Sequence, residues 1–342
     1  ATTAIYTLSL HDALPILATL LCVVGALLGL RMAGQWQPGQ SSERQLALER
    51  QAELVSSVMQ VTLILEILGL GLSVFVTDHL VGGIRGAMCA FGVLASTSTG
   101  FYGLFLSILT SMACGLWVVL HRFDLSIESP VLTRRKFAWL VPVGMLAVCD
   151  FALAVAFAWQ LDFEVVASCC SVWVDATVVN AHATKFMLPP LWAGGLGLAA
   201  TLLAAATSAA AGRWPGQGIA LTAGGMSALG GVAVLPAVLG VVAPHVLGTP
   251  THFCPFCLFH LQGDGLGWPL FTAIFLGSVT GMGLGIVELN RGAVGDEEPF
   301  RKMRRILGRW SAAAWLVALG CGVFPIARYW LQSGGATVFG KV

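Results

Sequence analysis

Eight apolar runs dominate this chain, and most of them are long enough to cross a bilayer. A helix needs about 20 apolar residues to span the hydrocarbon core. The runs lie at residues 17–31, 55–77, 99–120, 136–159, 187–211, 218–247, 267–289 and 306–333. The polar segments between them are short, and none is large enough for a soluble domain. We therefore expect an all-α protein, a polytopic transmembrane helical bundle of about eight spans, with residues 17–342 forming a single integral membrane domain.

The composition agrees with a membrane protein. Hydrophobic residues make up 57% of the 342 positions and charged residues only 10%, whereas soluble domains contain about 25% charged residues. The formal net charge is +1, and no basic patch with interleaved aromatic residues is present. The expected partner is therefore the lipid bilayer, and no nucleic acid is expected.

The first 16 residues stand apart from the rest of the chain. Tyr6–Ile16 reads YTLSLHDALPI, which is similar, residue for residue, to the translation of a common short-read sequencing adapter. We therefore expect residues 1–16 to be an assembly artefact, and we base no functional argument on His11 or Asp12.

The distribution of Lys and Arg predicts the orientation in the membrane. Cytoplasmic loops of bacterial membrane proteins carry an excess of these residues. Alternating spans place 14 of the 18 Lys and Arg on one side, chiefly in segments 121–136 and 291–309, and 4 on the other. We expect the first side to be cytoplasmic in a bacterial inner membrane. Segments 78–98, 161–185 and 245–266 then face the periplasm, while the orientation of the first span stays open.

Five of the nine cysteines fall in these outward segments. They are Cys89, Cys169, Cys170, Cys254 and Cys257. The periplasm is oxidising, so disulfides persist there. The other four lie within the predicted spans, where a cysteine usually behaves as a small hydrophobic residue; they are Cys22, Cys114, Cys149 and Cys321.

The most informative motif is Cys254-Pro255-Phe256-Cys257. A CxxC pair in an oxidising compartment favours thiol–disulfide exchange through a mixed disulfide. We expect Cys254 to be the more exposed nucleophile and Cys257 to resolve the intermediate formed with an extracytoplasmic protein partner. Cys169 and Cys170 complete the predicted catalytic set. Their Cα atoms, about 3.8 Å apart, are too close for a relaxed disulfide with each other, so at least one should approach Cys254 or Cys257.

Two family resemblances accompany these motifs. CPFCLF at a membrane boundary, with cysteines in another outer loop, resembles the vitamin K epoxide reductase and DsbB group. That resemblance implies electron transfer from protein thiols through Cys254 and Cys257 to a quinone cofactor. The chain departs from the pattern because Cys169 and Cys170 are adjacent and precede the CxxC by two spans. Separately, GAMCAFGV, ASCCSVW and HFCPFC together resemble an uncharacterised family of bacterial multi-span membrane proteins, associated with copper-protein maturation.

Metal binding is the alternative interpretation of the same residues. His252-x-Cys254-x-x-Cys257 is a compact ligand spacing, and His260 and Cys89 extend the set. Thiolates with imidazole suit copper or zinc, which would indicate metal delivery or transport in metalloprotein maturation. A third alternative is a structural membrane subunit whose outer cysteines form disulfides only.

Two carboxyl groups lie inside predicted spans, Glu66 in the second and Asp150 in the fourth. Charge at that depth is costly, so such acids usually face the bundle interior and mark proton or ion pathways. We expect them to relay protons or to line a cation path. The alternative is a neutral acid hydrogen-bonded to a neighbouring helix.

Small and kinking residues complete the predicted helices. The glycines at 281, 283 and 285 lie inside an apolar run without a preceding strand, so we expect them to allow close helix packing rather than to bind a nucleotide. Pro236 and Pro325 are expected to kink their helices.

Overall fold

The computed structural model describes residues 2–36, 42–84, 86–87, 89–127, 131–162, 188–250, 252–260, 263–294 and 297–340, with side chains from Ile16 onward. Eight helices in this part of the chain are long and apolar enough to cross a membrane. The predicted all-α, eight-span bundle is therefore confirmed. The chain divides into two compact units: unit 1 comprises residues 1–80, 93–164 and 290–300, and unit 2 comprises residues 81–92, 165–289 and 301–342.

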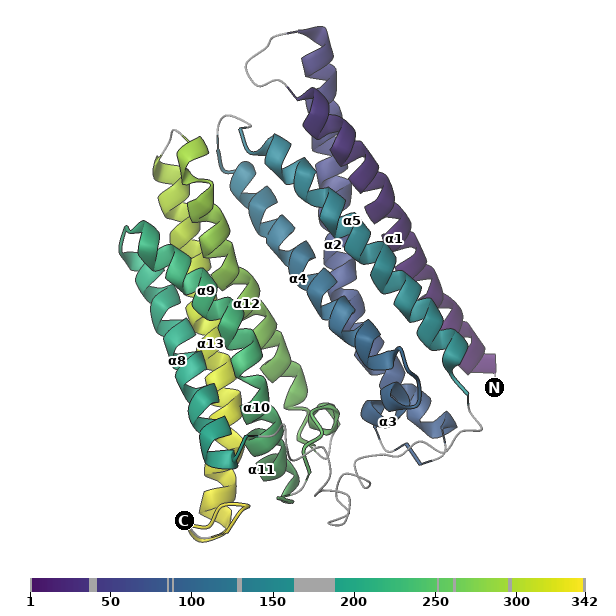
Figure 1. Cartoon of the computed structure of the whole chain (residues 1–342), viewed down its shortest axis with the longest axis vertical. Helices are drawn as coiled ribbons and strands as arrows, with labels where there is room; N and C mark the ends of the chain where they lie inside the picture. The colour runs from purple at the N-terminus through teal and green to yellow at the C-terminus, as the bar shows by residue number, and fades with distance from the viewer. Residues whose placement is uncertain are drawn as a thin grey trace. The chain divides into compact units, whose positions relative to one another are not determined.

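Unit 1 is built from four long helices that lie side by side (Figure 1). They are α1 (Thr2–Gln35), α2 (Glu43–His79), α4 (Gly100–Asp124) and α5 (Thr133–Gln160). Around the unit, α1 packs on α2 and α5, and α4 packs on α2 and α5. The Ser42 hydroxyl accepts a hydrogen bond from the Gln45 amide and so caps the start of α2. The completely buried Trp117 and Phe137 anchor the core of the unit.

Unit 2 contains the other four spans and the segments that connect them. The helices are α8 (Pro190–Arg213), α9 (Gln217–Ala233), α12 (Gly267–Leu289) and α13 (Glu297–Gln332), of which the last begins in unit 1. The sixth span continues beyond α9 as α10 (Leu235–Ala237), the π-turn η2 (Val238–Val242) and α11 (Ala243–Leu247). Pro236 thus interrupts its helix as expected, whereas Pro325 lies within the continuous α13. The short helix α3 (Ala90–Ala95) follows the second span and its terminal turn η1 (Leu80–Gly83).

Glycines allow the helices of unit 2 to approach closely. A Cβ atom on Gly308 of α13 would lie 2.7 Å from the Cα of Gly212 in α8. A Cβ atom on Gly224 of α9 would lie 3.3 Å from the Cα of Gly285 in α12. Such contacts hold helices together in lipid, where little hydrophobic force acts between them. The packing role predicted for the glycines of α12 is confirmed for Gly285 and for Gly281, where a Cβ atom would overlap the Ser227 side chain of α9.

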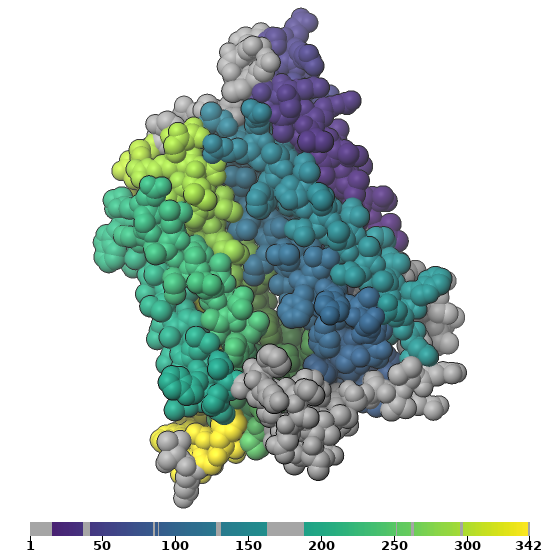
Figure 2. Space-filling model, viewed as in Figure 1, coloured from purple at the N-terminus to yellow at the C-terminus, as the bar shows by residue number. Residues whose placement is uncertain are grey.

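The outer surfaces of the helices are apolar. Leu20, Leu27 and Leu30 of α1 are all more than half exposed, on the helix coloured purple in Figure 2. On α8, Leu191 and Trp192 are 85% and 71% exposed. Large apolar side chains at this density mark a surface that contacts lipid rather than water. The bilayer is therefore the environment of this multi-pass protein.

Candidate functional site

Three cysteines from two distant segments meet within unit 2. Cys254 and Cys257 lie on the connection between α11 and α12, and Cys89 immediately precedes α3. Their Sγ atoms all lie within 4.8 Å of one another. The Sγ atoms of Cys89 and Cys254 are 3.4 Å apart, so the two thiols are in direct contact. We call Cys89, Cys254 and Cys257 the thiol cluster.

The local backbone explains how the connection after α11 presents its sulfurs. Gly248 ends α11 with φ at +67°, a left-handed conformation that costs glycine little. The chain then turns at Pro255 into η3 (Phe256–Phe259), where the Leu258 amide donates a 3.2 Å hydrogen bond to the Pro255 carbonyl. Phe256 and Leu258 are buried. These two buried side chains hold the turn against unit 2, and the sulfurs of Cys254 and Cys257 face Cys89.

Burial differs among the three sulfurs. Cys89 and Cys254 are 0% and 3% exposed, whereas Cys257 is partly exposed. The expectation that Cys254 would be the more exposed member of the CxxC pair is therefore wrong. The physical reason is that Cys254 packs against the buried Cys89, while Cys257 lies one turn further on.

His252, in the same loop, places a nitrogen donor beside one sulfur of the thiol cluster. Its Nε2 atom lies 3.2 Å from the Sγ atom of Cys257. Partial burial lowers the pKa of His252, and electrostatic attraction from Cys89 opposes that shift. A lowered pKa favours the neutral imidazole, which is the form that ligates metals. The thiol cluster and His252 together offer three sulfurs and one nitrogen, a combination found in zinc sites.

The other residues predicted for this site have different outcomes. His260 lies at the end of η3, where its carbonyl accepts hydrogen bonds from the Gly263 and Gly265 amides. Within the described part of the chain, its ring is not among the donors that converge with the three sulfurs. Cys169 and Cys170 lie outside the described residues, so their approach to the CxxC pair stays a prediction.

The two intramembrane acids lie in unit 1 and have neighbours that the sequence did not reveal. The Cys22 thiol of α1 donates to the Glu66 carboxyl of α2 over 3.9 Å. The Ser107 hydroxyl of α4 donates to the Asp150 carboxyl of α5 over 2.5 Å. Glu66 and Asp150 are close enough to interact electrostatically. Both acids thus face polar partners on other helices, in agreement with the expectation that they are turned toward the bundle.

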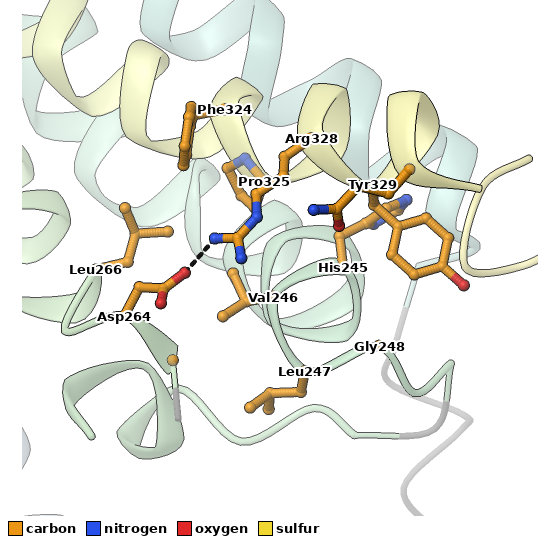
Figure 3. A pocket seen from close by; sticks show the side chains of 12 residues that line it. His245, Val246, Leu247, Gly248, Asp264, Leu266, Phe324, Pro325, Arg328 and Tyr329 are labelled. Carbon is orange, nitrogen blue, oxygen red and sulfur yellow. Dashed lines mark hydrogen bonds and ion pairs between the residues drawn. The ribbon is translucent and has the colours of Figure 1, made fainter. Parts of the chain in front are cut away.

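A cavity of about 270 Å³ lies beside the base of the loop that carries Cys254 and Cys257. Gly248 and Gly263, which flank this loop, both line it. Apolar and polar side chains share its wall, and the Arg328 guanidinium of α13 reaches across to the Asp264 carboxylate (Figure 3). This ion pair joins the segment before α12 to α13 at an exposed position.

A buried histidine forms another part of the cavity wall. His245 Nδ1 lies 2.7 Å from the Val241 carbonyl oxygen and donates to it. The ring meets Tyr329 and Phe339 edge-on, with centroids 5.6 Å and 5.5 Å away. These contacts hold the end of α11 against the C-terminal part of the chain, which gives His245 a packing role.

Comparisons with known proteins add no further identification. The chain matches no family model, and neither a curated protein nor a solved structure is significantly similar to it. The resemblances noted above therefore rest on their local motifs alone.

Proposed function

We propose that the thiol cluster binds a thiophilic transition-metal ion, Zn(II) or Cu(I), at the boundary of the membrane. The observation that carries this proposal is the convergence of three sulfurs within 4.8 Å. His252 adds a nitrogen 3.2 Å from the Cys257 sulfur. Thiolate and imidazole are the ligands that these ions prefer.

The distances suit a shared metal ion. Zinc–sulfur bonds of about 2.3 Å in a tetrahedron place ligand sulfurs about 3.8 Å apart. The observed 3.4 Å between Cys89 and Cys254 is close to that value. By the same geometry, a nitrogen ligand lies about 3.6 Å from a ligand sulfur, near the separation of His252 and Cys257. Binding through the three sulfurs would therefore require little movement, whereas the His252 ring, which lies beside Cys257 but outside the group that converges within 4.8 Å, would have to approach the other two sulfurs.

The uneven burial of the donors favours delivery over permanent storage. Cys89 and Cys254 are buried, whereas Cys257 and His252 lie at a partly exposed rim. An acceptor protein could replace the rim ligands first while the buried sulfurs still hold the ion. We infer a role in metal delivery or transport during metalloprotein maturation, with an extracytoplasmic protein as the partner.

The order of the spans and the distribution of Lys and Arg support a location for the thiol cluster. The segment with Cys89 follows the second span, and the loop with Cys254 and Cys257 follows the sixth. An even number of crossings separates them, so they share one face. Because 14 of the 18 Lys and Arg fall on the opposite face, we place the thiol cluster on the periplasmic side of a bacterial inner membrane.

Metal content of the purified, reduced full-length protein tests the proposal. Cys254→Ser should lose one metal equivalent relative to the unaltered protein. Cys321→Ser is the matched control, because Cys321 is a partly buried cysteine of α13 outside the cluster, and it should lose none. Equal metal content in all three proteins would refute the metal site.

Thiol–disulfide exchange is the second candidate, and the direct Cys89–Cys254 contact favours it. In this scheme a partner dithiol is oxidised and a protein disulfide is reduced, and a quinone finally accepts the electrons. The burial pattern makes Cys257 the thiol that forms the mixed disulfide and Cys254 the thiol that resolves it. Cys254→Ser should then trap a partner in a reductant-sensitive adduct. Metal binding instead predicts loss of the ion without an adduct.

A further inference from the structure

The contact between Cys89 and Cys254 gives the thiol cluster a second possible state besides the metal-bound one. Their Sγ atoms are in direct contact at 3.4 Å. A disulfide joins its sulfurs at about 2.05 Å, so the two atoms need to approach by about 1.4 Å to form one. A thiolate ligates a metal ion, whereas a sulfur in a disulfide no longer carries that charge. The pair therefore either holds an ion or forms a disulfide, and the two states exclude each other.

Burial determines the order in which the three sulfurs react with another protein. Cys89 and Cys254 are 0% and 3% exposed, so the disulfide of a partner cannot reach them directly. Cys257 is partly exposed, and its sulfur lies within 4.8 Å of the other two. Oxidation must therefore begin at Cys257 and pass inward by exchange between neighbouring sulfurs. In the metal-bound cluster the sulfurs are already thiolates, which is the form that attacks a disulfide.

We propose that the thiol cluster delivers its ion by thiol–disulfide exchange to a protein whose metal-binding cysteines are joined in a disulfide. This inference rests on the proposed function, because it requires that the cluster holds a thiophilic ion. The partner's disulfide is the oxidant. Its reduction creates two thiolates on the partner as Cys89 and Cys254 cease to be ligands. Disulfides persist in the oxidising periplasm, so a partner in this form is available on the face proposed for the cluster.

Electrons and charge balance in this exchange. The Cys257 thiolate attacks the partner's disulfide, forms a mixed disulfide and expels the first partner thiolate. The Cys254 thiolate then attacks the Cys257 sulfur and expels the second partner thiolate. Finally the Cys89 thiolate attacks the Cys254 sulfur, which forms the Cys89–Cys254 disulfide and returns Cys257 as a thiolate. Two thiolates of this chain lose two electrons, the partner's disulfide gains them, and the ion moves to the two new thiolates.

The exchange gives the transfer a direction. After it, the thiol cluster retains one thiolate, Cys257, whereas the partner has gained two, so the partner is the better ligand for a thiophilic ion. A new ion can bind only after a thiol reductant has reduced the Cys89–Cys254 disulfide. Metal binding and thiol–disulfide exchange, which the geometry supports separately, thus become two steps of one cycle.

Zinc transfer from the reduced full-length protein to a peptide disulfide tests this inference. Bound zinc is measured before any oxidant is added, and this first step tests the metal site alone. An excess of a synthetic peptide with an oxidised Cys-x-x-Cys pair should then remove one equivalent of zinc and reduce one peptide disulfide per ion. Mass spectrometry of the digested protein should find a Cys89–Cys254 cross-link. The same peptide with serine in place of both cysteines should remove no zinc.

Cys257→Ser tests whether the exchange passes through the exposed sulfur. The two sulfurs that remain in this variant are buried, so the metal-free variant should form the Cys89–Cys254 cross-link at least about tenfold more slowly with the same peptide. Cys321→Ser is the matched control, because Cys321 lies on α13 outside the cluster. It should form the cross-link at the rate of the unaltered protein.

The outcomes separate this inference from the metal site on which it rests. Zinc release without a Cys89–Cys254 cross-link, or zinc retained after the peptide disulfide has been reduced, would overturn the inference and leave the metal site standing. An equal rate of cross-linking in the Cys257→Ser variant would also overturn it, because the buried pair would then react directly. A reduced protein that binds no zinc in the first step would refute the metal site, and the inference with it.

Discussion

The Sγ atoms of Cys89 and Cys254 lie 3.4 Å apart although 165 positions separate the two residues in the sequence. One follows the second span and the other follows the sixth, so the contact depends on the tertiary structure of unit 2. Both side chains are almost completely buried. An ion held between them would be shielded from water, and its exchange would proceed through Cys257 and His252 at the rim.

Removal of a buried ligand should weaken metal binding strongly. Cys89→Ser deletes one of the three converging sulfurs without altering the CxxC loop itself. We expect the zinc dissociation constant to rise about a hundredfold, equivalent to about 2.7 kcal/mol. Competition with a fluorescent zinc chelator measures the change. Cys149→Ser, on an exposed thiol of α5, serves as the control and should leave the affinity unaltered.

Bound metal should also stabilise the protein. An ion that binds only the folded state contributes about 2.7 kcal/mol when its concentration is one hundred times the dissociation constant. Thermal unfolding in detergent should therefore shift upward with zinc and return to its starting value after chelation. A Cys254→Ser/Cys257→Ser variant should show no such shift. An equal shift in that variant would mean that the stabilising ion binds elsewhere.

The spans were predictable because their information is local, whereas their ends were not. Apolar composition over about 20 residues identifies a membrane helix without knowledge of its neighbours. Only residues 55–77 of the second span are apolar, yet α2 begins at Glu43. The additional turns are polar and start at the Ser42 cap, where backbone hydrogen bonding rather than hydropathy determines the helix.

The candidate site was predictable in its residue types but not in its arrangement. The motif indicated Cys254, Cys257 and His252, and the metal interpretation included Cys89. Spacing alone could not show that Cys254 is the buried member of the pair, because that depends on its contact with Cys89. Cys22 and Cys114 were expected to be simple apolar residues. The 3.9 Å approach of Cys22 to Glu66 arises from the packing of α1 on α2.

Thiol labelling can establish the face on which the cluster lies. Cys257 is the most exposed cysteine of the cluster. After the outer membrane has been removed and the disulfides have been reduced, a membrane-impermeant maleimide should therefore reach Cys257 while the inner membrane is still intact. A cysteine introduced by Lys302→Cys, at an exposed position near the start of α13, should react only after permeabilisation. The reverse pattern would invert the topology and place the cluster in the cytoplasm.

The strongest stability prediction concerns the ion pair between Arg304 and Glu288 in unit 2. An Arg304 Nη1 atom lies 3.3 Å from a Glu288 carboxylate oxygen, and the two side chains are only 4% and 0% exposed. Arg304 also donates to the Ala211 and Trp214 carbonyls at the end of α8. The arginine therefore joins three of the spans of this unit, and Glu288 compensates its charge.

Glu288→Gln should remove this buried charge partner of Arg304, and we expect a loss of about 3–5 kcal/mol in the free energy of unfolding. Glu297→Gln is the matched control, because the Arg291–Glu297 pair has the same chemistry but side chains that are 41% and 54% exposed. Water screens that pair, so its loss should cost less than about 1 kcal/mol. Denaturant unfolding in a mild detergent compares the two variants. Similar costs for both would show that burial does not determine the contribution of the Arg304–Glu288 pair.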